Sequence, residues 1–192
     1  MINSFPPGLI MFIGAFLIPF FPYVARQFYM IVLVLFSALS LMNGFGTHLT
    51  LNILDYDFII YHADNLSFPF AIVFHIAAFI TIIYGCHKKD WKESMAITSY
   101  AGAAIAALHA GDLFTLFVWW EATAFTSVFL ILGGNTLRAY KAAFRYIVIQ
   151  VGSGMFLLAG AVIFLYTNEH ANFGKMSIDE TSGILVFLAF GI

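Results

Sequence analysis

Glu121 is the one charged residue in the apolar stretch 113–130, which is long enough to cross a lipid bilayer. A carboxylate at membrane depth is costly unless it is protonated, paired with a cation or hydrated. Desolvation favours the protonated form and a nearby cation favours the ionised form, so a moving partner would make Glu121 bind and release a proton. We therefore predict a proton-binding carboxylate. The alternative is a permanently protonated glutamate that fixes helix packing through a backbone carbonyl.

Further polar residues could support this chemistry. Asp112 lies nine residues before Glu121, or about 13 to 14 Å along a helix, and His109 lies close to Asp112. Gln150 could help to hydrate a path, and Arg145 could tune the proton affinity of Glu121 from the cytoplasmic side. His75 and His109 could relay protons, ligate haem iron or serve only in packing.

The composition indicates an integral membrane protein. Hydrophobic residues make up 62% of the chain and charged residues 9%, whereas soluble domains carry about 25% charged residues. The mean hydropathy is +0.94. A single cysteine, Cys86, excludes an internal disulfide and a cysteine-ligated cluster. The net charge of −2 indicates no nucleic-acid partner, and no metal or nucleotide motif predicts a cofactor.

The apolar stretches predict an all-α integral membrane protein with about seven transmembrane helices in one domain of residues 1–192. An alternating stretch, 48–65, predicts a strand or hairpin outside the membrane. The first apolar stretch lacks the basic start and cleavage pattern of a signal peptide, so we expect it to be retained. The expected helices span residues 7–21, 28–43, 66–84, 95–110, 113–132, 142–166 and 183–192.

The charged residues segregate between the expected loops. If the N-terminus lies outside, the cytoplasmic side holds a set of basic residues, and the outer loops hold acidic residues with Lys175 as their one base. This positive-inside pattern predicts a multi-pass protein of the inner (cytoplasmic) membrane with its N-terminus outside. The basic set is Arg26, Lys88, Lys89, Lys92, Arg138, Lys141 and Arg145, and the acidic set is Asp55, Asp57, Asp64, Asp112, Glu169, Asp179 and Glu180.

The last expected helix, 183–192, would extend only about 15 Å. Its final carbonyl groups would then lie near the bilayer midplane, where unsatisfied backbone groups are expensive. We therefore expect this chain to be part of a longer polypeptide or to be completed by a second chain.

Several segments resemble one known group of membrane proteins. Residues 110–121 (AGDLFTLFVWWE) resemble the helix that carries the essential glutamate in antiporter-like membrane subunits. This superfamily comprises the A-type and D-type subunits of Mrp-type multisubunit Na⁺/H⁺ antiporters and the proton-pumping membrane subunits of respiratory complex I. Residues 63–67 and the region from 138 to 154 match as well, and 6–8 and 187–192 are similar to bacterial Mrp D-type sequences. The resemblance covers essentially the whole chain.

The resemblance implies the N-terminal half of an antiporter-like helical bundle. It implies a proton-translocating subunit of a multisubunit cation/proton antiporter that exchanges Na⁺ or K⁺ for H⁺, with Glu121 as the proton-binding residue and other membrane subunits as partners. In this family a lysine on the helix after the sixth works with the glutamate. Here the sequence ends at Ile192, where that lysine would come, so we expect a partner chain to supply the lysine-bearing helices.

Three other functions remain open from the sequence. The chain could be the proton-pumping membrane subunit of a complex I-like or hydrogenase-type redox complex. It could be a haem-bearing electron-transfer subunit that uses His75 and His109. It could also be a non-transporting scaffold in which Glu121 is vestigial.

Overall fold

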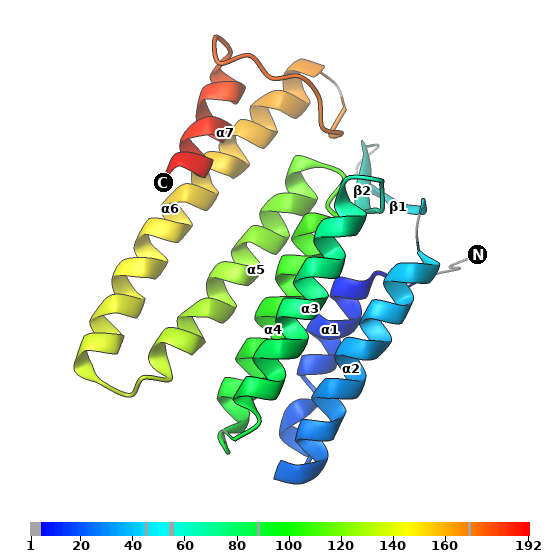
Figure 1. Ribbon diagram of the computed structural model, residues 1–192. Coiled ribbons are helices and arrows are strands. Elements are labelled where there is room, and N and C mark those ends of the chain that lie inside the picture. The colour runs from blue at the N-terminus through cyan, green and yellow to red at the C-terminus, as the bar shows by residue number, and fades with distance from the viewer. Residues whose placement is uncertain (1–4, 45, 54–55, 88, 169) are drawn as a thin grey trace.

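The computed structural model describes residues 5–44, 46–53, 56–87, 89–168 and 170–192 (Figure 1). Asp55, Lys88 and Glu169, which contribute to the predicted orientation, lie outside the described residues. The predicted all-α class is confirmed, because the described residues form seven α-helices and one two-stranded hairpin. The elements are α1 (Pro7–Ala15), a 3₁₀ turn (Ile18–Phe20), α2 (Tyr23–Asn43), β1 (His48–Ile53), β2 (Tyr56–His62), α3 (Ser67–Gly85), α4 (Trp91–Leu108), α5 (Leu113–Leu132), α6 (Leu137–Asn168) and α7 (Thr181–Gly191).

Successive helices run antiparallel, so the connections gather at two ends of the bundle (Figure 1). The β1–β2 hairpin and the α4–α5 and α6–α7 connections lie at one end, which we call the hairpin end. The α1–α2, α3–α4 and α5–α6 connections lie at the opposite end. The described acidic residues of the sequence pattern thus lie toward the hairpin end and the basic residues toward the opposite end. Which end faces the cytoplasm stays a prediction.

The first helix is shorter than expected. The predicted helix 7–21 is wrong beyond Ala15, where α1 ends and a separate 3₁₀ turn, Ile18–Phe20, follows. Pro19 explains the break, because proline lacks an N–H and its ring clashes with the carbonyl four residues earlier, which is that of Ala15. At nine residues, α1 is about 14 Å long and does not reach across a bilayer by itself.

Four of the described helices, α2, α3, α5 and α6, are long and apolar enough to cross a membrane. The expected number of helices is confirmed, since the described residues form seven α-helices, and four of these meet the length and composition of a span by themselves. Helix α4 falls short because small and polar residues replace large apolar ones. The small residues allow a close approach to α1: a Cβ on Gly102 would lie 2.5 Å from Phe12 N, and one on Gly8 would lie 2.6 Å from Ala106 Cα. Helix α4 therefore packs closely against α1 and is covered by protein.

Four helices start earlier than the hydropathy pattern indicates: α4 by four residues, at Trp91, α7 by two, at Thr181, and α2 and α6 by five each. Helix α2 begins at Tyr23, five residues before the expected start at 28, and α6 begins at Leu137 in place of 142. The first turn of α2 is fixed by side chains that hydropathy counts as polar. Tyr23 OH donates to Cys86 O at 2.6 Å, and Arg26 Nη2 donates to Lys89 O at 2.7 Å. These bonds join α2 to the α3–α4 connection at the end opposite the hairpin.

The buried apolar side chains form two clusters. The first lies among α1, α2, α3 and α4 and contains Met11, Met30 and Ile82, among others. The second lies among α5, α6 and α7 and is built around Leu157 and Phe164. Helices α4 and α5 pack against each other and join the two halves. The second half therefore positions Glu121, which α5 carries.

Candidate functional site

Glu121 is the ninth residue of α5 and is half-buried. Its Oε1 atom is shielded from solvent and has no hydrogen-bond partner among the residues that the structure describes. Most buried polar atoms in proteins have a partner. The carboxyl group that the sequence singles out is thus available for a proton, a water molecule or a cation.

The carboxyl group lies against the backbone of α6 at Gly154. A Cβ atom placed on Gly154 would overlap Glu121 Oε1 and would lie 2.8 Å from Glu121 Cδ. The same added atom would lie 3.5 Å from Phe117 Cε2, one turn earlier on α5. The carboxyl group therefore occupies the space that a side chain at 154 would fill.

Trp120, which precedes Glu121 on α5, carries a second buried polar atom. Its Nε1 is buried and has no partner in the described part of the chain. The Trp120 ring packs edge to face against Phe190 of α7, with ring centroids 5.2 Å apart. Two adjacent residues of α5 thus each carry a buried polar atom that has no hydrogen bond to a described residue, a feature that the sequence pattern does not reveal.

Polar side chains continue from Glu121 toward the end opposite the hairpin. Tyr146, Gln150 and Gly154 are spaced by four residues and so lie on one face of α6. The hydroxyl groups of Tyr146 and Ser127 are hydrogen-bonded at 2.8 Å and link α6 to α5. Gln150 therefore lies between Glu121 and this pair along the α6 face. Sequence reasoning named Gln150 but missed Tyr146 and Ser127, although the four-residue spacing was visible.

Arg145 lies farther from Glu121 than the sequence pattern suggests. Its side chain is exposed at the end opposite the hairpin, where it lines a cavity together with Arg138 and Lys141. Nine residues separate Arg145 from Gly154, which is about 13 to 14 Å along α6. An influence of Arg145 on Glu121 stays a prediction, and any such influence acts over that distance.

Asp112 is fully buried, and both of its oxygen atoms accept hydrogen bonds. Oδ1 accepts from Thr115 N at 2.7 Å, which caps the start of α5. Oδ2 accepts from Ile59 N at 2.7 Å and from Thr115 Oγ1 at 2.9 Å. Asp112 therefore anchors β2 to α5, and its predicted part in a proton relay stays a prediction.

His109 follows the last residue of α4 and is buried beneath the hairpin. Its Nδ1 is hydrogen-bonded to Ile105 O at 2.8 Å, and its ring stacks on Tyr61 at a centroid distance of 5.1 Å. Burial lowers the pKa of His109, so the imidazole is neutral near pH 7. Its Nε2 and the Tyr61 hydroxyl are both buried without a partner among the described residues.

His75 is buried in α3 and uses both ring nitrogens within the protein. Nδ1 is hydrogen-bonded to Ala71 O at 2.7 Å, and Nε2 to Ser37 Oγ at 2.9 Å. The Ser37 hydroxyl also reaches Pro7 O at 2.8 Å. To bind haem iron through Nε2, His75 would have to give up its bond to Ser37, and the haem alternative stays an untested alternative.

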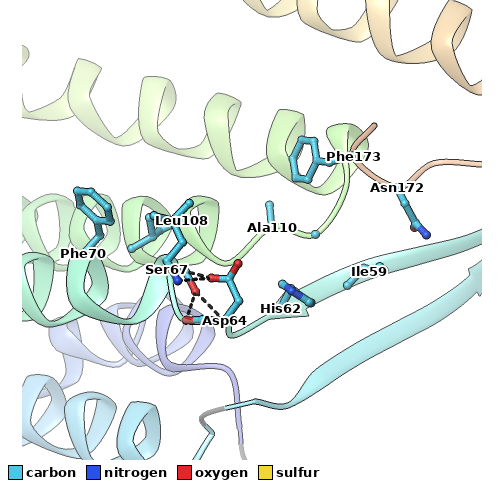
Figure 2. A pocket seen from close by; sticks show the side chains of 11 residues that line it. Ile59, His62, Asp64, Ser67, Phe70, Leu108, Ala110, Asn172 and Phe173 are labelled. Atoms are coloured by element: carbon cyan, nitrogen blue, oxygen red, sulfur yellow. Dashed lines mark hydrogen bonds between the residues drawn. The ribbon is translucent and has the colours of Figure 1, made fainter. Parts of the chain in front are cut away.

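A cavity of about 630 Å³ lies at the hairpin end (Figure 2). Its lining includes Ile59 and His62 of β2 and Asn172 of the α6–α7 connection. Asp64 also lines it and accepts a hydrogen bond from Ser67 N at 2.6 Å, and this bond holds the pKa of Asp64 below its usual value. Glu121 is not among the lining residues, so this cavity is separate from the Glu121 position.

Comparison with known proteins confirms the resemblance to antiporter-like membrane subunits. Residues 110–191 match the family described as "NADH:quinone oxidoreductase/Mrp antiporter, TM". The matched segment extends from the start of α5 to the end of α7 and contains both Glu121 and Gly154. Because the family unites the two kinds of complex, the match does not separate the D-type Mrp subunits from those of complex I.

Two solved structures share the fold. A chain of respiratory complex I from Thermus thermophilus with bound aureothin superposes with a TM-score of 0.78 at 14% identity, covering 96% of this chain and 43% of that chain. A chain of the membrane-bound sulfane sulfur reductase, an archaeal respiratory membrane complex, superposes with a TM-score of 0.71 at 20% identity, covering 86% and 37%. At these identities the likeness shows the fold alone. This chain spans less than half the length of either matched chain.

Proposed function

We propose that this chain is a proton-translocating membrane subunit in which Glu121 is the proton-binding residue. The observation that carries the proposal is the half-buried carboxyl group in α5 whose Oε1 lacks a hydrogen-bond partner in the described chain. Glu121 is the one charged residue of α5, and α5 is long and apolar enough to span a membrane. Ionisable residues in such positions commonly mark ion pathways.

The chemistry requires a partner whose position changes. A cation brought near Oε1 would favour the ionised carboxylate and expel the proton, and its withdrawal would favour proton uptake. Helices α5 and α7 contain no basic residue. On α6, the basic residue nearest to Gly154 is Arg145, about 13 to 14 Å away along the helix. We propose that the partner comes from a membrane helix outside the described residues, on this polypeptide or on another subunit. The greater length of the matched chains supports this.

We propose an Mrp-type antiporter as the complex, with this chain as its D-type component, which exchanges Na⁺ or K⁺ for H⁺ across the inner membrane. The sequence resemblance of residues 6–8 and 187–192 supports this choice, as does a family match that includes Mrp antiporters. The basic residues at the end opposite the hairpin support an orientation with the N-terminus outside.

A second candidate is a proton-pumping subunit driven by a redox reaction. It is favoured by one observation, namely that both matched structures are respiratory complexes. The two candidates differ in their driving force. In vesicles that contain the purified complex, an antiporter moves protons when a Na⁺ or K⁺ gradient is imposed, whereas a redox-driven pump moves them only when an electron donor and acceptor are supplied.

The test of the proposal is proton movement in those vesicles with Glu121→Gln. Glutamine keeps the size of the side chain but cannot bind and release a proton, so we expect assembly to be intact and transport to be lost. Glu180→Gln is the matched control, because Glu180 is exposed in the α6–α7 connection. Normal transport with Glu121→Gln would refute the assignment and favour the scaffold alternative.

A further inference from the structure

Helix α6 has two glycines two residues apart that meet different surroundings. A Cβ added to Gly152 would have nothing within 4 Å, whereas one added to Gly154 would overlap the carboxyl group of Glu121. Glycine weakens a helix interior relative to alanine, so helix stability gives no reason for glycine at 154. The contact with Glu121 supplies a reason.

Neighbouring contacts fix which face of α6 meets Glu121. The Ser153 hydroxyl is buried and donates to Ala189 O of α7 at 2.7 Å. This bond directs Ser153 toward α7, while the next residue, Gly154, faces α5. Phe117 closes the space on the α5 side. The register of the three helices therefore places the carboxyl group directly on the Gly154 backbone.

Few other ionisable groups share this space. Glu121 is the one ionisable residue of α5, and α7 has none in Thr181–Gly191. Helix α4, which also packs against α5, carries Lys92, Glu93 and Tyr100. On α6, Tyr146 is two turns from Gly154, and Arg145 and Lys141 lie beyond it toward the end opposite the hairpin. The contact with Gly154 of α6 therefore forms part of the immediate surroundings of the Glu121 carboxyl group.

We propose that Gly154 is a positioning residue for Glu121, and that the absence of a side chain at 154 creates the niche that holds the carboxyl group. Any methyl group at 154 displaces the carboxyl group from this niche and changes its protonation. The meaning of this niche for transport rests on the proposed function, but the position of the carboxyl group can be tested separately.

The test compares Gly154→Ala with Gly152→Ala in the intact complex, with Glu121→Gln as a blank. A hydrophobic carbodiimide, which modifies protonated carboxyl groups in apolar surroundings, is added over a range of pH, and modification of Glu121 is measured by mass spectrometry. We expect a roughly tenfold lower modification rate at neutral pH in Gly154→Ala, which corresponds to about one pH unit in proton affinity. We expect Gly152→Ala to match the wild type. The pH profile of transport should change in the first variant and not in the second.

A rescue experiment covers the outcome in which Gly154→Ala does not assemble. Glu121→Ala removes the carboxyl group that the new methyl meets, so the double variant should assemble where the single variant does not. Failure of this rescue, or equal modification of Glu121 in both glycine variants, would overturn the inference. If the Glu121→Gln variant transports protons normally, the proposed function is refuted. If modification of Glu121 nevertheless differs between the Gly154→Ala and Gly152→Ala variants, the positioning role of Gly154 is still supported.

Discussion

Asp112→Ala should loosen the junction between the hairpin and α5. Asp112 is fully buried and accepts three hydrogen bonds, from Thr115 N, Thr115 Oγ1 and Ile59 N. Loss of a helix N-cap costs about 1 kcal/mol, and an unpaired buried N–H adds about 1 to 3 kcal/mol. We therefore expect local destabilisation of about 3 kcal/mol at this junction.

Hydrogen–deuterium exchange of the Ile59 and Thr115 amides measures this effect where it arises. About 3 kcal/mol corresponds to roughly hundredfold faster exchange of these two amides. Asp57→Ala is the control, because Asp57 is an exposed residue of the same hairpin and surface substitutions of this kind usually change stability by less than about 0.5 kcal/mol. If Asp112→Ala exchanges no faster than this control, the anchoring role assigned to Asp112 is incorrect.

Three further predictions concern packing, pH and the polar row on α6. Gly102→Ala should lower the melting temperature of the complex, because the new methyl meets the α1 backbone at a cost of about 1 to 3 kcal/mol, and Gly152→Ala should not. Burial lowers the pKa of His109, so the unfolded chain binds its proton more tightly; stability should fall as pH drops below about 6.5, and less so in His109→Gln. Unchanged pH dependence in that variant would contradict the reasoning. Tyr146→Phe removes the bond to Ser127 and should slow proton transport without loss of assembly; unimpaired transport would limit this pair to packing.

Much of the fold follows from local physics and could be predicted from the sequence. Apolar length gives the helices, and the alternation of polar and apolar residues within 48–65 gives a hairpin. The break after Ala15 was also within reach, since Pro19 forbids the backbone bond to that residue. The early start of α2 could not be predicted from the sequence, because Arg26 is held in the helix by the Lys89 carbonyl, 63 residues away. Hydropathy carries no information on such a contact.

Some features of the candidate site could likewise be predicted from the sequence, and others depend on how the helices pack. The sequence identifies Glu121 because a charge in an apolar helix is costly wherever that helix packs. The sequence does not show that Gly154 lies opposite Glu121, since this depends on the register of α5 against α6, which the α5–α6 connection and the packed side chains set together. His75 and Asp112 likewise each have one partner from a distant segment, Ser37 of α2 and Ile59 of β2 respectively, and local patterns do not specify these.

The most direct test of the central claim is an infrared titration of the purified complex. A protonated carboxyl group in an apolar site gives a carbonyl stretching band distinct from those of ionised carboxylates, so difference spectra between high and low pH report its protonation. We predict one such band that is present in the wild type and in Glu180→Gln and absent in Glu121→Gln. A spectrum of Glu121→Gln that is identical to the wild type would show that Glu121 does not exchange a proton and would contradict the account.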